Sequence, residues 1–567
     1  MIKYDYIIKI SVFLRLYYVL GVVAWLVAAY GISRLFMNPF FWLMFAIPFF
    51  LISANRIFNF IMIAFFYKKF SLTEHKNKRE SFFSDRGRDL PSVDIFIPNV
   101  GEEIAVLRNS YEGISNITYE GDVLVHCLDD AGRKDVELLA QEFGFNYVNR
   151  PNAGEMKKAG NLRYSYERTS GDYIVVFDAD VRPAADFLLE TLPYMDTDVG
   201  ILQTPQNFPM TKNVNRNSLI EWQAGDIQQD FYRLVQPSRD RFCSAICVGT
   251  NAVYSRRALF ASGGFAQVDR SEDVFTGLKT TASGFRVKYI PLILAVGYNP
   301  PTVEGFFRQH NRWCSGSVKL AFSKLMWSKE ISNINRVFYL SGSLNYFSAA
   351  MSVIFAFHVW IIILFHANDL SIDYLVYFLP SMVFQLFMPL TRVYRSVRSF
   401  TRPLIGNIQK YTYFYSYWML LRGANMGWTA TAESGHSRND FFMSFVGLVF
   451  AVCVLNLLAA VYFVISCVAA SDYQVFTYPI VLYFFYSFYA NFTLFLISFR
   501  EYVGEEVSYD FERFSIESIN LDKYKSDYVP IIMSDPDVRW AEAVSEVVPE
   551  VVPEVKGNVE RDASVPA

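Results

Sequence analysis

The sequence predicts an α/β domain with a mostly parallel sheet, inserted between α-helices that span a membrane. The first reason is composition: of 567 residues, 52% are hydrophobic and 17% aromatic, which is more apolar than one water-soluble fold. The second is that short apolar runs alternate with amphipathic stretches from about residue 71 to residue 336, as in folds that alternate strands and helices. The net charge of −3, without a basic, aromatic-rich patch, argues against nucleic acid as a partner.

Six apolar stretches are long enough to cross a lipid bilayer. They are Val12–Leu35, Phe40–Phe66, Val337–Phe365, Ile372–Leu390, Phe441–Ala469 and Phe476–Phe499. The first is long and lacks a small-residue cleavage site, so we expect it to be retained and not removed as a signal peptide. Asn55, Arg56 and Asn59 interrupt the second, which is either a snorkelling helix end or a helix that faces protein.

Lys and Arg gather at one set of span ends, among them Lys68, Arg336 and Arg500, whereas the opposite loops carry few. By the positive-inside rule, both termini and the polar domain lie in the cytoplasm. We therefore expect a multi-pass protein of the plasma membrane, with the lipid bilayer as one partner.

These observations divide the chain into seven parts. They are residues 1–70 (two spans), 71–312 (cytosolic domain), 313–336 (interfacial helix), 337–390 (two spans), 391–440 (second interfacial helix and a loop), 441–499 (two spans) and 500–567 (a cytosolic tail, partly disordered). An interfacial helix over Trp313–Trp327 and an ordinary amphipathic core helix fit the sequence equally well.

Within the polar domain, apolar runs of strand length predict the sheet. They are Val93–Pro98, Val123–Leu128, Tyr173–Phe177, Ile201–Gln203 and Val287–Ile290. The third run ends on Asp178 and Asp180, at the edge where open α/β sheets bind ligands. Two carboxylates there could bind a divalent cation that bridges a diphosphate, although acidic turn residues after strands are also common.

Four polar clusters follow one another along this domain: Asp129-Asp130, Asp178 with Asp180, Glu272-Asp273, and Gln309 to Trp313. Taken singly, they could be a turn pair, a strand cap, a helix N-cap and the start of an amphipathic helix. Their joint occurrence in this order favours a site for a nucleotide-sugar.

With these residues, the sequence resembles the processive inverting glycosyltransferases of family 2, in the cellulose synthase-like branch. The resemblance covers about residues 90–320. The matching motifs are Leu128-Asp129-Asp130, Lys158-Ala159-Gly160-Asn161, Phe177-Asp178-Ala179-Asp180, Gln203-Thr204-Pro205, Gly249-Thr250, Gly263-Gly264-Phe265, Ser271-Glu272-Asp273 and the QxxRW signature at Gln309–Trp313.

The resemblance implies a glycosyltransferase A-type domain and a role for each motif residue. Asp273, with Glu272 beside it, matches the base that takes the acceptor proton, and Asp178 with Asp180 matches the pair that holds Mg²⁺ or Mn²⁺. Other matches concern the ligands: Glu102, Asp129, Asp130, Lys158, Asp178 and Arg312 for the nucleotide-sugar, and Gln309 and Trp313 for the acceptor.

The sequence departs from the family pattern at the segment that closes over the nucleotide. Trp428 and Thr431 fit this gating loop, but Glu433 stands where a lysine is expected. A negative charge there would not bind a diphosphate in the same way. The polar tail is too short for a cyclic-di-GMP-binding module, so regulation through such an attached domain is not expected.

The resemblance predicts a membrane-embedded synthase that transfers glucose from UDP-glucose to a growing β-glucan polysaccharide with inversion and secretes it through its own channel. A chitin- or hyaluronan-type synthase using UDP-N-acetylglucosamine is the enzymatic alternative. A non-processive lipid glycosyltransferase, a catalytically dead scaffold and a transporter are the others; the retained acids and the inserted α/β domain argue against the last two.

Overall fold

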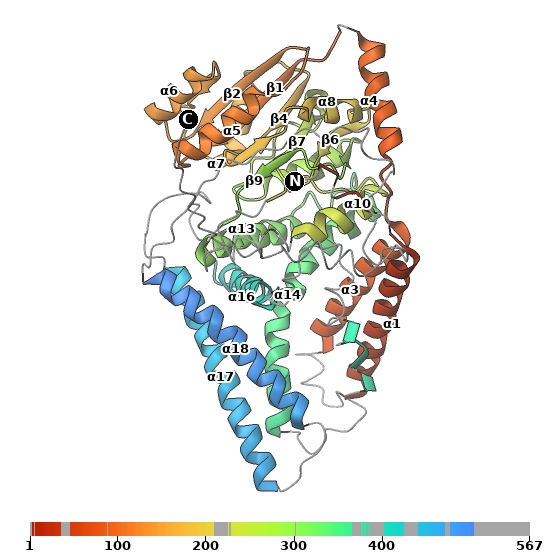
Figure 1. Cartoon of the computed structure of the whole chain (residues 1–567), viewed down its shortest axis with the longest axis vertical. Coiled ribbons are helices and arrows are strands. Elements are labelled where there is room, and N and C mark those ends of the chain that lie inside the picture. The colour runs from red at the N-terminus through yellow and green to blue at the C-terminus, as the bar shows by residue number, and fades with distance from the viewer. Residues whose placement is uncertain are drawn as a thin grey trace, which may run out of the picture.

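The computed structural model describes residues 3–4, 6–8, 10–35, 46–87, 89–208, 225, 228–300, 302–365, 376–377, 379–381, 383–384, 402–423, 440–470 and 477–503. A mixed α/β domain lies at one end of the molecule, and the long helices α17 (Asp440–Ala470) and α18 (Thr477–Tyr502) extend from the other (Figure 1). This arrangement confirms the predicted α/β domain with a mostly parallel sheet.

The central sheet has seven strands in the order β3-β2-β1-β4-β7-β6-β8. Their bounds are β1 (Val93–Asn99), β2 (Val123–Asp129), β3 (Asn146–Val148), β4 (Tyr173–Val176), β6 (Val199–Gln203), β7 (Ala252–Ser255) and β8 (Arg286–Tyr289). Only β7 runs antiparallel to its neighbours, β4 and β6. Because β1, β2 and β4 are parallel, Asn99, Asp129 and the residues after Val176 come out at the same edge.

Strands β5 (Val181–Pro183) and β9 (Ala295–Gly297) form a separate antiparallel pair. Helix α4 (Leu72–Arg86) precedes β1. The other helices of this domain lie between the strands in sequence: α5 (Ile104–Ser115), α6 (Lys134–Glu142), α7 (Lys157–Tyr166), α8 (Phe187–Thr191), the 3₁₀ turn η2 (Leu192–Tyr194), the π-helical turn η3 (Phe231–Val235), α10 (Gln236–Asp240), α11 (Arg256–Ala261) and α12 (Glu272–Ala282).

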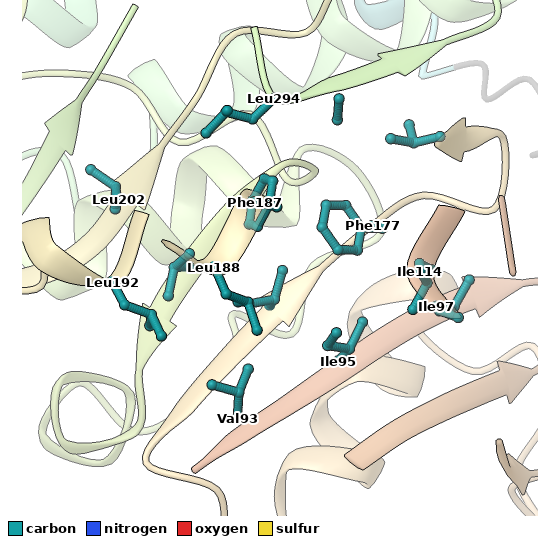
Figure 2. Packing of buried hydrophobic residues seen from close by; sticks show 14 of the residues in the cluster. Val93, Ile95, Ile97, Ile114, Phe177, Phe187, Leu188, Leu192, Leu202 and Leu294 are labelled. Atoms are coloured by element: carbon teal, nitrogen blue, oxygen red, sulfur yellow. The ribbon is translucent and has the colours of Figure 1, made fainter. Parts of the chain in front are cut away.

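Alternating strand residues form the core on the two faces of the sheet. Ile95 and Ile97 of β1 pack on one face with Phe177 and Phe187 (Figure 2). Phe96, between those isoleucines, belongs to the cluster on the other face. Full burial of each such side chain contributes about 1.5–3 kcal/mol, and a slip of one residue would move every side chain to the wrong face. The core thus fixes the register that sets the site edge.

Four described helices are long and apolar enough to cross a membrane: Val12–Gly31 of α1 (Val12–Leu35), Pro48–Phe66 of α3 (Ile47–Phe66), Asn333–Ile354 of α14 (Asn333–Phe365) and Asp440–Tyr462 of α17. They correspond to four of the six predicted spans. A fifth, Phe476–Phe499, overlaps α18, which is not one of these four helices, and most of Ile372–Leu390 lies outside the described residues. The orientation of the helices in a bilayer stays a prediction.

Two helices lie between the α/β domain and the long helices, namely α13 (Val303–Ala321) and α16 (Arg402–Leu421) (Figure 1). Helix α13 begins ten residues before the predicted boundary at residue 313 and ends before Trp327. Its start is set by Thr302, whose side chain accepts a hydrogen bond from the Gly305 amide at 3.0 Å. The motif from Gln309 to Trp313 is therefore in the middle of a continuous helix.

Candidate functional site

The predicted site residues converge on one pocket of about 250 Å³ at the carboxyl edge of the sheet. Those that line it are Glu102, Asp130, Lys158, Asp178, Asp180, Glu272, Asp273, Gln309, Arg312 and Trp313. Asp129 does not line it, and Trp428 and Thr431 lie outside the described residues. Residues from positions 102 to 313 are thus brought together by strand ends and by the three helices α7, α12 and α13.

Asp178 and Asp180 reach the pocket because β4 ends at Val176, just before them. The Asp178 amide donates a hydrogen bond to the Thr250 hydroxyl at 2.9 Å, which joins the segment after β4 to the loop before β7. The Asp178 carboxylate forms an ion pair with Lys158. This neighbour holds one of the two acids beside a fixed positive charge.

Lys158 connects three parts of the pocket. Its ammonium group donates to the Gly249 carbonyl at 3.0 Å and lies 3.8 Å from Glu272, besides its pair with Asp178. Burial lowers the pKa of Lys158, but the charges of Asp178 and Glu272 outweigh burial, so the pKa lies above its ordinary value. The side chain therefore stays positively charged at neutral pH.

The backbone before Lys158 is strained. Met156 and Lys157 have φ angles of 52° and 51°, in the left-handed region that side chains rarely adopt. A Cβ on Gly160, one turn later, would lie 2.2 Å from the Glu155 carbonyl, so only glycine fits there. Such strain persists where the surrounding fold holds it, and it is common at ligand sites.

Asp180 is surrounded by negative charge. Burial and the charges of Asp178 and Glu102 raise its pKa to about 7. The Glu102 carboxylate accepts hydrogen bonds from the Val100 and Gly101 amides, at 2.8 and 3.1 Å, and this fixes its position. A cation beside these acids would relieve their mutual repulsion. The described residues contain no group of three or more His, Cys, Asp or Glu side chains placed as a complete ligand set.

The two neighbouring aspartates after β2 have different surroundings. Asp129 is fully buried and accepts hydrogen bonds from the Ala131 and Arg133 amides, at 3.0 and 2.6 Å, so it closes the turn after the strand. Asp130 lines the pocket, and Arg150 holds it by two hydrogen bonds of 2.5 and 2.8 Å. In this structure Asp129 shapes the loop, and Asp130 is the member of the pair that faces the pocket.

Asp273 stands in the first turn of α12, two residues after Ser271, which has a left-handed φ of 53°. Burial and the negative charge of Glu272 raise the pKa of Asp273 to about 7. Gly249 has a φ of 81°, and a Cβ there would lie 2.8 Å from the Cβ of Asp273. The glycine in the Gly249-Thr250 motif therefore leaves the space that the aspartate occupies.

Helix α13 presents Gln309, Arg312 and Trp313 to the pocket from the side of the long helices. Burial and the neighbouring charge of Arg270 lower the pKa of Arg312 to about 10, so the guanidinium stays charged at neutral pH. Asp178, Glu272 and Asp180 are close enough to act on the same group electrostatically. A positive charge and an indole thus face the acidic cluster across the pocket.

Sequence reasoning missed two residues that support this helix. His310 packs its ring 4.6 Å from the Trp313 ring, and its Nδ1 lies 2.6 Å from the Tyr413 hydroxyl of α16. Arg270 lines the pocket and donates to the Ser315 hydroxyl at 2.7 Å. The sequence gives only their positions, His310 inside the QxxRW motif and Arg270 just before Ser271-Glu272-Asp273, because both roles depend on contacts across the fold.

Gln203, from the motif Gln203-Thr204-Pro205, is fully buried and does not line the pocket. Its amide nitrogen donates to the Thr250 carbonyl at 2.7 Å, and its oxygen accepts from the Val248 amide at 2.8 Å. It therefore fixes the loop that carries Gly249 beside Asp273.

A second cavity of about 520 Å³ adjoins the pocket, between the α/β domain and α3, α13, α14 and α16; we call it the helix-side cavity. Its wall includes Tyr18, Arg56, Asn59, Phe60, Gln228, Asp230, Tyr232, Arg239, His310, Ser317, Tyr339, Ser341, Ser343, Asn345, Tyr346, Ala349, Gln409 and Tyr413. The pocket and the cavity share Gln206, Val248, Ser271, Asp273 and Trp313. Arg56 and Asn59 of the second predicted span therefore face a protein cavity.

Comparison with known proteins adds family relationships to this geometry. The family model described as "Glycosyl transferase family group 2" matches residues 173–497. "Cellulose synthase 1" of Komagataeibacter xylinus is 33% identical over 269 residues, which cover 47% of this chain and 17% of that protein. The "Cellulose synthase catalytic subunit [UDP-forming]" of Xanthomonas axonopodis pv. citri is 31% identical over 268 residues, 47% of this chain and 37% of that protein.

These matches span less than half the length of each of the two relatives. Among solved structures, the mannosyltransferase PcManGT from Pyrobaculum calidifontis in complex with GDP-Man and Mn²⁺ is similar to 65% of this chain and 99% of its own. Its sequence identity is 16% and its TM-score 0.43.

Proposed function

Because this chain belongs to the glycosyltransferase family 2 group, we propose that it is a membrane-embedded, processive polysaccharide synthase. It transfers glucose from UDP-glucose to a growing β-glucan with inversion, and the product leaves through a channel between its own helices. One observation carries this proposal: Asp273, the acidic pair Asp178 and Asp180, and Trp313 line one pocket, which adjoins a larger cavity between the helices.

The chemistry needs a base and a way to stabilise the departing diphosphate. In an inverting transfer, an acceptor hydroxyl attacks the anomeric carbon while the bond to UDP breaks. Asp273 takes the hydroxyl proton, and its raised pKa of about 7 suits a base that works near neutral pH. Lys158 and Arg312 supply fixed positive charge on the side where negative charge develops on UDP.

The donor set also fits a divalent cation. Asp178 and Asp180 would hold Mg²⁺ or Mn²⁺, because hard cations prefer carboxylate oxygens and Mg²⁺ is commonly held by one or two carboxylates together with substrate phosphates. The raised pKa of Asp180, caused by burial and two acidic neighbours, is the feature of this chain that fits such an ion. When bound, the ion supplies charge neutralisation at the leaving diphosphate.

The acceptor end of the polymer lies at Trp313, which lines both the pocket and the helix-side cavity. An indole gives a pyranose ring a broad apolar contact and leaves the sugar hydroxyls free. Beyond it, the cavity wall carries Asn59, Ser343 and Tyr413, whose polar groups suit a hydrated sugar chain. The polysaccharide can therefore extend from the transfer site toward the membrane helices.

Glucose is the proposed sugar because the relatives reported above are named as cellulose synthases, one of them as UDP-forming. The test is UDP release by the full chain in detergent with Mg²⁺ or Mn²⁺, offered UDP-glucose or UDP-N-acetylglucosamine, followed by size and linkage analysis of the product. Long β-glucan made from UDP-glucose is expected. Turnover of the acetylated donor alone, or a product with one added sugar, would overturn the proposal.

The same preparation tests the base. Asp273→Asn keeps the side-chain shape but cannot take the proton, so the rate of UDP release should fall about 10²- to 10⁴-fold while UDP binding is retained. Calorimetry of UDP binding is the control. Near-normal turnover of this variant would rule out Asp273 as the base.

A further inference from the structure

Arg239 of α10 is a buried cation on the wall of the helix-side cavity, only 3% exposed. One guanidinium nitrogen, Nη2, donates to the Ser341 hydroxyl at 3.0 Å, and the group lies 5.6 Å from the Phe338 ring centre. The other terminal nitrogen, Nη1, has no hydrogen-bond partner among the residues that the structure describes. Within the described part of the chain, no carboxylate pairs with this side chain.

The other unmatched polar atoms of this wall have the same character. Gln228 Nε2 is a second buried donor, and it has no acceptor within the described part of the chain. Among the described residues, His310 Nε2 also has no hydrogen-bond partner, and this nitrogen can donate when it carries the ring proton. Among the described residues of the wall, the unmatched groups thus call for a ligand rich in acceptor oxygens.

The positive charge of Arg239 distinguishes a neutral hydrogen-bond acceptor on the ligand from an anionic one. A hydroxyl of a neutral sugar could satisfy the free N–H of Arg239, but it would leave the buried positive charge without a counter-charge. The cavity wall also carries a second arginine, Arg56. The wall has two carboxylates, and neither forms an ion pair with Arg239: Asp230 interacts elsewhere within the protein, and Asp273 is the base of the transfer site. An anionic oxygen group on the ligand would satisfy Arg239 in both respects.

We propose that Arg239 forms an anion subsite for the polymer, and that the polymer carries the carboxylate of a hexuronic acid unit past it. This rests on the function proposed above. A hexuronate keeps the pyranose ring of a hexose and differs at carbon 6, so it suits the same path. The unit comes from a UDP-hexuronate: the acceptor hydroxyl gives its proton to Asp273, its oxygen bonds to the anomeric carbon, and UDP leaves. No oxidation step is needed.

The experiment uses the full chain in phosphatidylcholine nanodiscs with UDP-glucose and radiolabelled UDP-glucuronic acid, separately and together. We expect label in a long, acidic product when both donors are present. A neutral glucan with no label overturns this inference and leaves the proposed function standing. Failure to turn over UDP-glucose in any arm overturns the proposed function itself. A parallel arm uses nanodiscs that also contain phosphatidylglycerol. Activity that appears only in that arm, without label in the product, would overturn the inference and assign the subsite to a lipid phosphate.

Substitutions of Arg239 test whether incorporation of the radiolabelled hexuronate depends on this side chain. Arg239→Gln should lower label incorporation about tenfold or more, since a hydrogen bond to a charged group is lost, while UDP release from UDP-glucose alone changes less than about twofold. Arg239→Lys keeps the charge and should retain most of the incorporation. Arg241→Gln, an exposed arginine two residues away, is the matched control and should behave as the wild type. If Arg239→Gln lowered UDP release from UDP-glucose alone as much as it lowered label incorporation, the proposal would be overturned. The result for the wild-type protein stands even if a variant fails to fold.

Discussion

At the scale of single residues, Asp273 and Glu272 make the transfer site sensitive to pH. Burial and the charge of Glu272 raise the pKa of Asp273 to about 7, and the base works only when ionised. UDP release should therefore rise as pH increases through about 7. Glu272→Gln removes a neighbouring negative charge, so the pKa of Asp273 should fall. The rising limb of the pH–rate profile should then move to lower pH.

A pH–rate profile of kcat/KM for both proteins measures this shift. Glu304→Gln, a change on α13 away from Asp273, is the control and should leave the limb in place. A limb that stays fixed, or moves to higher pH in Glu272→Gln, would show that Glu272 does not set the ionisation of the base.

Gly249 offers a second test at this scale. Alanine there must adopt a φ of 81° and place its Cβ 2.8 Å from the Cβ of Asp273. Gly284 has a similar φ of 88°, but no atom of the described residues lies within 4 Å of the position of a Cβ. Both alanine variants bear a backbone cost of roughly 1–2 kcal/mol, but only Gly249→Ala displaces the base.

Thermal unfolding and initial rates separate the two effects. Both variants should lose similar stability, while Gly249→Ala alone should lose about tenfold or more in kcat because a small misplacement of a catalytic group is costly. Equal activity in the two variants would show that Asp273 tolerates displacement.

At the scale of elements, a carboxylate of α18 holds the start of α13. The two Glu501 oxygens accept hydrogen bonds from the Val303 and Glu304 amides, at 2.9 and 2.8 Å. These amides have no partner within their own helix. Because α13 carries Arg312 and Trp313, the end of the last long helix contributes to the position of the acceptor site.

Glu501→Gln replaces one acceptor oxygen by a carboxamide NH₂ group, which is a donor and faces a backbone N–H donor. We expect kcat to fall several-fold with little change in KM for the donor, since the nucleotide contacts of Lys158 and Asp178 come from other elements. Glu304→Gln, in the same helical turn, keeps both contacts to Glu501 and should have little effect. A rise in donor KM with unchanged kcat would contradict a positioning role for Glu501.

The same elements show how far the sequence could lead. Five strands were predicted because their apolar runs have strand length and end in polar residues, as at Asp178. Strand β7 (Ala252–Ser255) was missed because it is short and follows a motif that had been read only as Gly249-Thr250. Helix α13 was placed too late because its first turn depends on Thr302 and on Glu501, which is 198 positions from Val303.

In the site, too, features set by local sequence were predictable and features set by distant contacts were not. Acids at strand ends are visible in the sequence because a strand and its last residues are local. His310, Arg270 and Arg239 were not predicted as site residues, since their roles depend on partners such as Tyr413, Ser315 and Ser341 that only the folded chain brings near. The separate environments of Asp129 and Asp130 also needed the structure, because Arg150 contacts only the second carboxylate.

At the scale of the whole molecule, the proposed route runs from the pocket through the helix-side cavity along α14. Ala349 lines that cavity, whereas Val337 of the same helix is 50% exposed on its outer side. Ala349→Phe should fill part of the cavity, so the enzyme should still start transfer on short acceptors but stop after few sugars. Val337→Phe adds an aromatic ring on the exposed side and should leave product length unchanged.

Product size by gel filtration, together with the initial rate of UDP release on a short oligosaccharide acceptor, tests this route. A shortened product with a preserved initial rate is the expected result for Ala349→Phe, because the transfer chemistry at Asp273 and Asp178 is untouched while the space for the chain is reduced. If Ala349→Phe made polymer of wild-type length, the product would have to leave by another path, and the helix-side cavity would hold only the first units of the acceptor. If both variants shortened the product equally, the effect would belong to helix packing and not to the cavity.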